Sequence, residues 1–427
     1  MMKTNSSVNV DERDTCKEVS ANSEPPKITV NSNNSIDVIS NEDDFFALHE
    51  QWNKINDESP KGNVFNSWEW LYTWWQIYQN QSKRSLYILT CTNKDNELLG
   101  IAPFQIINNP KKYFPCNRQL ILLGTGETDG SLVFGEYMDL LIKPAHETSV
   151  IEAFSNYLEQ HKDLWDGLKF QQQLAESHLS QLFQTGSSSN SQFLKDELNL
   201  RIVENGYRTV LTLPKTYKKY LMRLSKKMRN NITRIHSRLE SEQNFTIDLI
   251  TPESEVNAGL NQQDDGITVL SKLNRMRRRN DTAIASVFDQ ENFELFHRRL
   301  LKRLLPLNKV SLRILRFNEE PVAALYSFLD RDTVHVYQSG FETENGHRYS
   351  LLTTMLTQEI SKSIENPDMN LFNFMYAEDE YMYKNRYSGA TERMYDLSYD
   401  KRGLKYSLYR FIHGYLKSLV KKLLKMS

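Results

Sequence analysis

A three-strand meander near residues 311–341 is the feature that most constrains how this chain can fold. Its predicted strands, Ser311 to Phe317, Val322 to Leu329 and Thr333 to Phe341, are rich in β-branched and aromatic residues. Short polar turns separate them, so consecutive strands are expected to lie side by side. Helical periodicity comes both before and after the meander, which predicts a sheet flanked by helices.

The first half of the chain repeats this layout. A tryptophan-rich helix is predicted after Asn66-Ser-Trp-Glu69, which has the spacing of a capping box. The other elements expected in the first half are strands at 86–91, 98–107, 119–123, 137–142 and 168–172, and a helix at 147–161. Those expected in the second half are helices at 217–239, 266–278, 290–304 and 350–364, and strands at 371–376 and 394–399. The repeated order predicts an α/β (α+β) fold with two tandem copies of a mixed, mostly antiparallel sheet flanked by helices.

Composition divides the 427 residues into four parts. Residues 1–34 are polar and poor in aromatics, which predicts a disordered tail. Domains are expected at 35–205 and 206–400, because 427 residues exceed what one core usually organises. Residues 401–427 carry lysine and arginine but no acid, with apolar residues at helical spacing, which predicts a basic amphipathic helix. Such a helix either binds an anionic membrane surface or docks back onto the domain.

The overall composition excludes several classes of protein. The net charge of −1 argues against a globally basic nucleic-acid binder, and no apolar run approaches the roughly 20 residues of a membrane span. Three scattered cysteines and nine histidines without ligand spacing predict no disulfide framework and no metal site. The amino terminus lacks the apolar core of a secretory signal, so a cytoplasmic protein is expected.

Several segments occur in an order that resembles a known family. They are Ser67-Trp-Glu-Trp-Leu-Tyr-Thr-Trp-Trp75, Leu99-Gly-Ile-Ala-Pro-Phe104, Glu136-Tyr-Met-Asp139, Leu221-Met-Arg-Leu-Ser-Lys-Lys-Met-Arg-Asn-Asn231, Pro321-Val-Ala-Ala324, Tyr337-Gln-Ser-Gly-Phe341 and Glu380-Tyr-Met-Tyr-Lys-Asn-Arg-Tyr387. The pattern resembles the CelD/BcsL-type acetyltransferases of the GNAT superfamily, whose architecture is close to the FemAB-type tandem enzymes. The resemblance implies two GNAT-like domains and transfer of an acyl group, such as acetyl, from acyl-coenzyme A. It also implies an amine or hydroxyl acceptor, such as a sugar or a cell-envelope or exopolysaccharide precursor, with the donor held by the second domain.

The loop that enters the predicted helix at Ser350 is the candidate donor site. A helix N-terminus offers free backbone N–H groups and a positive dipole end to the diphosphate of coenzyme A. The residues expected to bind it are Gly346, Arg348, Tyr349, Ser350 and Leu351. The alternative is a plain helix cap with a solvated arginine. The family's Ser-Pro-Gly segment is absent at this point, which favours a further alternative, a non-catalytic binding or scaffold protein of envelope assembly.

Acyl transfer also requires a group that removes a proton from the acceptor. Alternation along the third meander strand places His335 and Tyr337 on one face, where His335 could act as the base. A half-exposed sheet face is the competing explanation for this pattern. In the first half, Tyr137 and Asp139 are candidates for acceptor binding.

A second candidate for proton transfer follows the predicted strand at 371–376. Glu378, Glu380 and Tyr383 are candidate catalytic groups there, and Lys384 and Arg386 are candidate substrate-binding cations. A solvated acidic cap at the start of a helix is the alternative.

The segment from Lys215 to Arg238 is strongly basic and contains no acid. Lys226 and Arg229 are its candidate acceptor-binding residues. An acid-free basic run attracts a phosphorylated ligand, an anionic membrane or RNA, and charge alone does not separate these partners. An aminoacyl-tRNA donor, as in FemAB-type proteins, is therefore the alternative to acyl-coenzyme A; otherwise a nucleic-acid partner is not expected.

Overall fold

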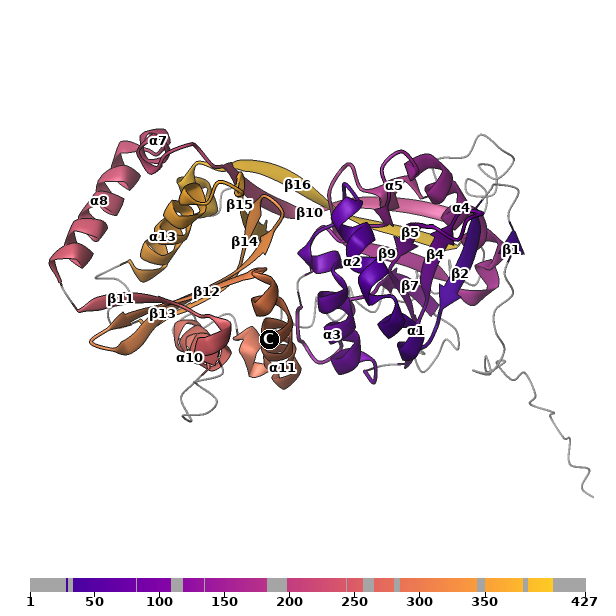
Figure 1. Ribbon diagram of the computed structural model, residues 1–427, viewed down its shortest axis with the longest axis horizontal. Helices are drawn as coiled ribbons and strands as arrows, with labels where there is room; N and C mark the ends of the chain where they lie inside the picture. Colours follow the sequence, from indigo (N-terminus) through magenta and orange to yellow (C-terminus); the bar gives the residue numbers. More distant parts are fainter. Residues whose placement is uncertain are drawn as a thin grey trace, which may run out of the picture.

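The structure, a computed structural model, contains two sheets flanked by helices (Figure 1). It describes residues 28–29, 34–81, 83–108, 118–133, 135–182, 198–242, 244–255, 265–279, 285–343, 350–378 and 383–401. The predicted tail at 1–34 lies outside the described residues except for positions 28, 29 and 34. The predicted helix at 401–427 lies outside them except for position 401. The mixed α/β fold class predicted from the sequence is confirmed.

The larger sheet runs through both halves of the chain. Its order is β11 (Phe245–Leu249), β12 (Val310–Phe317), β13 (Glu320–Asp330), β14 (Thr333–Phe341), β15 (Leu371–Ala377), β10 (Leu198–Thr212), β16 (Ala390–Lys401), β9 (Gly167–Gln173), β7 (Arg118–Leu122), β6 (Phe104–Asn108) and β3 (Lys83–Leu86). All neighbours are antiparallel except β14 with β15 and β7 with β9. The meander is formed by β12, β13 and β14, within about two residues of its predicted bounds.

The smaller sheet belongs to the first half. Its order is β1 (Ile28–Thr29), β2 (Ser35–Ile39), β4 (Ile88–Thr92), β5 (Leu98–Ala102) and β8 (Leu141–Ile142). The strands predicted at 86–91 and 98–107 are each divided between the two sheets, at Tyr87 and Pro103. Proline has no N–H for a ladder bond, which explains the break at Pro103. Only Leu141–Ile142 of the strand predicted at 137–142 forms.

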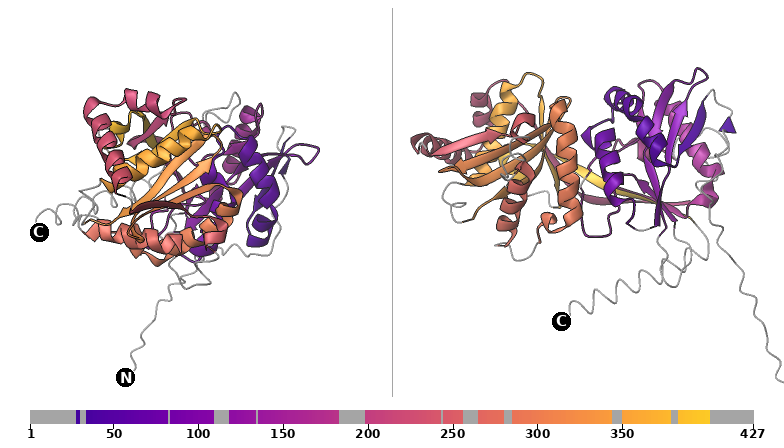
Figure 2. Two further views of the ribbon diagram at one scale, coloured as in Figure 1. Left: turned by 60° about the vertical axis from the view of Figure 1, so that its left-hand side comes forward. Right: turned by 60° about the horizontal axis from the view of Figure 1, so that its bottom comes forward.

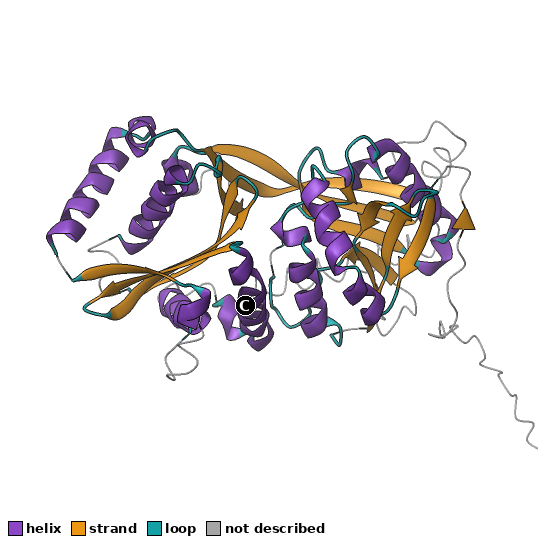
Figure 3. Cartoon of the chain, viewed as in Figure 1, coloured by secondary structure: helices purple, strands orange, loops and turns teal. Residues whose placement is uncertain are grey.

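Helices flank the sheets (Figure 3). The first half contains α1 (Glu42–Ala47), α2 (His49–Glu58), α3 (Trp68–Tyr78), α4 (Glu147–Gln160) and α5 (His178–Gln181). The second half contains α7 (Tyr217–Arg223), α8 (Lys226–Ser241), α10 (Gly266–Arg279), α11 (Glu291–Leu304) and α13 (Leu351–Glu365). Figure 1 shows α13 on one side of the meander and α10 on the other. The helices α3 and α11 lie where the two halves meet (Figure 3).

The helix predicted at 217–239 is two helices. Leu224 is extended, with ψ of 153°, and ends α7. The Ser225 hydroxyl then accepts the Met228 N–H at 3.2 Å and begins α8. A serine N-cap thus interrupts a segment whose periodicity is otherwise continuous.

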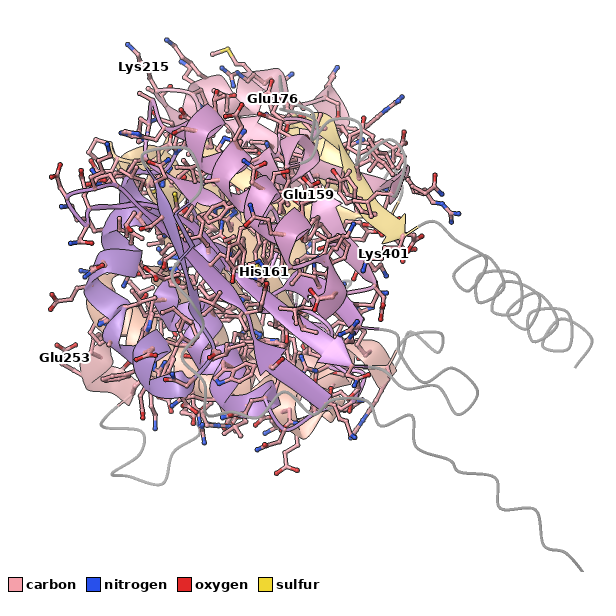
Figure 4. The ribbon with its side chains drawn as sticks, turned by 90° about the vertical axis from the view of Figure 1, so that its right-hand side faces the viewer. Glu159, His161, Glu176, Lys215, Glu253 and Lys401 are labelled. Carbon is pink, nitrogen blue, oxygen red and sulfur yellow. The ribbon has the colours of Figure 1, made fainter. Side chains whose placement is uncertain are left out.

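Strands β10 and β16 join the two halves (Figure 2). β10 pairs with β15 over 207–212 and with β16 over most of its length, whereas β16 pairs with β9 of the first half. At its far end, Lys401 Nζ donates to the carbonyls of Lys162 and Trp165 beyond α4, near His161 in Figure 4. The predicted boundary at 205/206 falls inside β10, at a bulge where Gly206 has φ of +80°. The two predicted domains therefore share one sheet.

The larger hydrophobic core also spans both halves. Trp70 on α3 is fully buried; its ring lies 4.9 Å from Phe65 in the first half, and 5.1, 5.3 and 5.7 Å from Phe296, Phe328 and Tyr337 in the second. Aromatic side chains bury large apolar areas, so this cluster fixes the halves against each other.

Candidate functional site at the junction of the two halves

The parallel strands β14 and β15 separate soon after they begin. They pair only at Thr333 with Leu371, Val334 with Phe372 and His335 with Asn373. The meander ladder contains a bulge at Tyr337, just beyond this point. The part of β14 after His335 therefore has no β15 partner among the described pairs, and the divergence lies at the junction with the first half.

Side chains of the first half enter this divergence. The Glu136 carboxylate accepts the Tyr376 N–H on β15 at 2.9 Å, and the Tyr137 hydroxyl donates to the same carboxylate. Glu136 and Tyr137 are 2% and 8% exposed. Polar groups buried to this degree require partners, and here the two halves supply them to each other.

Asn373 on β15 completes a buried hydrogen-bonded network, which consists of Glu136, Tyr137, Asn373 and His335. Its Oδ1 accepts the Met375 N–H at 2.9 Å, which fixes the orientation of the amide. Its Nδ2 therefore faces Tyr137 Oη at 3.1 Å and His335 Nδ1 at 3.2 Å and donates to both. Since Nδ1 accepts, the neutral His335 ring carries its proton on Nε2.

The electrostatics of this buried network favour uncharged groups. Burial lowers the pKa of His335 to about 3, and Arg208 adds to this effect, so the imidazole is neutral at physiological pH. Burial likewise raises the pKa of Glu136, against the opposing effects of its hydrogen bonds and of Lys384 and Arg208. The Arg208 guanidinium lies 4.8 Å from the centre of the Tyr137 ring.

Lys384 adds a buried amine next to the network. It belongs to the 3-10 helix η5 (Tyr383–Tyr387), and Nζ donates to the carbonyls of Met375 at 2.9 Å and Tyr376 at 2.5 Å. Burial lowers its pKa to about 8, while Glu136 acts in the opposite direction. An amine with such a pKa exchanges protons near neutral pH, which is what general acid–base chemistry requires.

The N-terminus of α13 lies at the same end of the sheet. Ser350 has φ of 47° and its side chain makes no cap hydrogen bond. Within the described residues, no side chain accepts the N–H groups of the first turn, and the turn contacts η5 through the Tyr387 hydroxyl and Thr353 Oγ1 at 3.3 Å. Leu351 is buried, whereas Gly346, Arg348 and Tyr349 lie outside the described residues.

The structure brings two of the predicted site residues, Tyr137 and His335, into one network and places a third, Lys384, next to it. Their roles in catalysis and binding stay predictions. The sheet face that carries His335 and Tyr337 is buried, at 5% and 9% exposure, rather than half-exposed. Because Nδ1 of His335 is bonded to Asn373, a role as base would require that hydrogen bond to break.

Two other predicted residues that the structure describes, Asp139 and Glu378, lie apart from the network. Asp139 accepts the N–H groups of Leu140, His178 and Leu179, so it caps α5. Glu378 is exposed beyond β15, Glu380 lies outside the described residues, and of Tyr383 only the backbone is described.

A separate cavity of about 870 Å³ lies between α7, α8 and η5. Four cationic side chains line it: Arg223, Lys227, Arg234 and Arg386. Arg386 was a predicted binding residue. Lys226 and Arg229 do not line the cavity, and Arg229 Nη1 instead donates to the Leu221 carbonyl at 3.4 Å.

Sequence reasoning missed Glu136 and Asn373 as site residues. Each is a polar residue among apolar or aromatic neighbours, in Phe134-Gly-Glu-Tyr-Met138 and Leu371-Phe-Asn-Phe-Met375. A lone polar residue in an otherwise apolar strand is a signal, because burial forces it to find a partner. Among the residues described, no group of three potential metal ligands is found. Nor does any described helix have the length and apolar character needed to cross a bilayer.

Two buried histidines predict a specific acid sensitivity. Burial lowers the pKa of both His297 and His335 to about 3, against about 6.5 in an unfolded chain. Below about pH 6.5 the unfolded chain binds protons that the folded chain does not, so the free energy of unfolding falls as pH decreases toward 3.

His297 lies in an aromatic cluster, and neither ring nitrogen has a hydrogen-bond partner among the described residues. The free energy of unfolding of His297→Phe, relative to that of the natural protein, should therefore increase as the pH is lowered. Urea unfolding at about pH 7, 5 and 4 measures this difference. His146→Gln, at an exposed position, should show no such gain; an equal gain in both variants would contradict the assignment.

Comparisons with known proteins agree with this architecture. Residues 226–385 match the family described as acetyltransferase (GNAT) domain. No curated protein is significantly similar to the chain in sequence. Among solved structures, FemX is 10% identical with a TM-score of 0.54, over 85% of this chain and 98% of FemX. A conserved protein of unknown function from Bacteroides thetaiotaomicron is 12% identical with a TM-score of 0.47, over 86% and 100% of the two chains. L-PGS from Bacillus licheniformis is 14% identical with a TM-score of 0.46, over 83% and 93%.

At these identities the likeness to FemX concerns the fold alone. The narrower resemblance to CelD/BcsL-type enzymes stays a prediction. The span 226–385 includes β14, α13, β15 and Lys384, and therefore most of the network just described. The chain has a tandem GNAT-like fold whose second half matches the acetyltransferase (GNAT) domain.

Proposed function

We propose that this protein transfers an acyl group, in the first instance acetyl, from acyl-coenzyme A to an amine or hydroxyl of an acceptor. The acceptor class we favour is a sugar or an envelope or exopolysaccharide precursor, modified in the cytoplasm or at the inner face of the membrane. One observation carries the donor assignment. Within the span that matches the acetyltransferase (GNAT) domain, a parallel strand pair diverges at the end of the sheet where α13 begins, and the Ser350 side chain makes no cap hydrogen bond there.

The residues at this place suit a diphosphate-bearing thioester. The first turn of this 15-residue helix, whose N–H groups no side chain of the described residues accepts, supplies hydrogen-bond donors and the positive end of the helix dipole. A bound thioester would supply the activated acyl group. Lys384, whose pKa is lowered to about 8, is the buried group best suited to exchange a proton near it.

Placing a negative charge at this helix N-terminus should weaken donor binding. Ser350→Asp introduces a carboxylate where the diphosphate would lie, while Ser350→Asn adds a side chain of the same shape without charge. Both residues tolerate the left-handed backbone found at Ser350. We expect the dissociation constant for acetyl-coenzyme A to rise about tenfold more in Ser350→Asp than in Ser350→Asn, measured by isothermal titration calorimetry.

The same titrations separate the competing functions. Saturating acetyl-coenzyme A should raise the melting temperature of the natural protein, because a ligand that binds only the folded state stabilises it. An aminoacyl-tRNA-dependent transferase is the second candidate, favoured by the four cations that line the α7–α8 cavity. Binding of aminoacylated tRNA without binding of acetyl-coenzyme A would select it, and binding of neither would favour a non-catalytic protein.

A further inference from the structure

The cavity between α7, α8 and η5 is lined by cations and by no carboxylate. Some other arginines of the second half form ion pairs with carboxylates: Arg275 with Glu294 at 2.9 Å, and Arg316 with Asp248 at 2.6 Å. In the described part of the chain, Arg223, Lys227, Arg234 and Arg386 form no ion pair, and no acidic residue lines the cavity. Among the described residues, no carboxylate therefore neutralises their positive charge.

The four cations come from two segments far apart in the sequence. Arg223 ends α7, Lys227 and Arg234 lie on α8, and Arg386 lies on η5. The Ser388 hydroxyl faces the Arg223 carbonyl at 3.5 Å, which connects η5 to the α7–α8 junction. A solvated helix face would place its charges along one helix, whereas these charges converge on one cavity.

The remaining lining residues suit a ligand with hydroxyl groups. Amides and hydroxyls that both donate and accept hydrogen bonds line the cavity at Ser225, Asn230, Asn231, Asn385 and Ser388. Leu224, which is buried, and Met228 provide an apolar surface of the kind that packs against the C–H face of a sugar ring. The volume of about 870 Å³ lies in the range of small-molecule sites.

We infer that this cavity binds the acyl acceptor, and that the acceptor is a phosphorylated sugar. The cations hold the phosphate through charge-assisted hydrogen bonds, and the amides and hydroxyls hold the sugar. This inference rests on the proposed acyl transfer for the role of the ligand, but the binding itself is independent of it. The phosphate could be a monoester or part of a diphosphate link, because both present the same oxygen chemistry to arginine.

The binding test uses glucose 6-phosphate, uridine diphosphate glucose and unphosphorylated glucose as probes with the full chain. Calorimetric titration should detect binding of both phosphorylated probes and no binding of glucose. The phosphorylated probe with the lower dissociation constant shows whether the site prefers a monoester or a diphosphate link.

The double variant Lys227→Ala/Arg386→Ala should weaken binding of the phosphorylated probes at least about tenfold, since one lost charge-assisted hydrogen bond is worth that much. The matched control is Lys218→Ala/Lys219→Ala, which removes the same charge from exposed positions of α7 outside the cavity. The control should change binding less than about twofold.

Three results would overturn the inference. Equal losses in the two double variants would mean that the basic surface attracts anions without a site. Competition between the sugar phosphate and acetyl-coenzyme A would assign the cavity to the donor. Binding of a short RNA hairpin, lost in Lys227→Ala/Arg386→Ala, without binding of either sugar phosphate would assign it to nucleic acid. If acetyl-coenzyme A fails to bind while sugar phosphate does bind in the cavity, the acyl transfer fails and the cavity assignment stands.

Discussion

Replacing Asn373 with leucine is expected to lower the free energy of unfolding by roughly 4 kcal/mol, because it leaves two buried polar groups without partners. The Met375 N–H loses Oδ1 and His335 Nδ1 loses Nδ2, and Asn373 is only 1% exposed, so water does not replace them. The Tyr137 hydroxyl loses a donor but keeps Glu136. Equilibrium urea unfolding at neutral pH measures the change.

The control for this variant lies three residues earlier in the chain. Asn370→Leu makes the same chemical change at an exposed position, where the side-chain amide donates to Asp332 at 3.4 Å. It should cost less than about 0.5 kcal/mol, in the usual range for surface substitutions. Equal losses in Asn370→Leu and Asn373→Leu would mean that the network does not hold β15 in place.

Asn373→Asp tests the hydrogen-bond roles within the network. The aspartate still accepts the Met375 N–H but no longer donates to His335. A nearby carboxylate favours the imidazolium form, so the pKa of His335 should rise from about 3. Imidazole proton shifts followed by NMR during a pH titration would report it. An unchanged His335 titration would contradict the orientation assigned to the Asn373 amide.

Local signals made part of this fold predictable. The α3 helix begins at Ser67, whose hydroxyl accepts the Trp70 N–H at 3.3 Å, and the tryptophans that follow are buried as their helical spacing indicates. The meander was predictable for the same reason, since each strand pairs with its neighbour in sequence across a short turn. In such elements the partners are close along the chain.

The shared sheet could not be predicted in this way. Asn205-Gly206 has the composition of a turn, and the sequence placed a domain boundary there, yet the structure uses Gly206 for a bulge inside β10. The partner of β10 is β16, nearly two hundred residues later, and no local pattern identifies a partner at that distance. The site also depends on distant partners. Tyr137, His335 and Lys384 were chosen by residue type, but Tyr137 and His335 meet at Asn373 only through long-range pairing.

Trp70→Ala is expected to have the other large effect, a loss of about 4 kcal/mol in the free energy of unfolding. Trp70 is fully buried and contacts aromatic rings of both halves, so its removal leaves a cavity where the halves meet. Phe46→Ala is the control, because Phe46 is 58% exposed and its ring contacts are with Trp68 and Tyr72 of the first half. It should cost less than about 1 kcal/mol.

The cooperativity of unfolding should change as well as the stability. Because the larger core includes residues of both halves and β10 and β16 cross between them, the natural protein should unfold in one calorimetric transition. Trp70→Ala weakens packing between the halves while leaving each half its own sheet contacts, so its transition should broaden or divide in two. Two transitions already present in the natural protein would mean that the shared strands do not couple the halves. A single sharp transition in Trp70→Ala, with the loss of stability unchanged, would mean that β10 and β16 carry the coupling without the aromatic cluster.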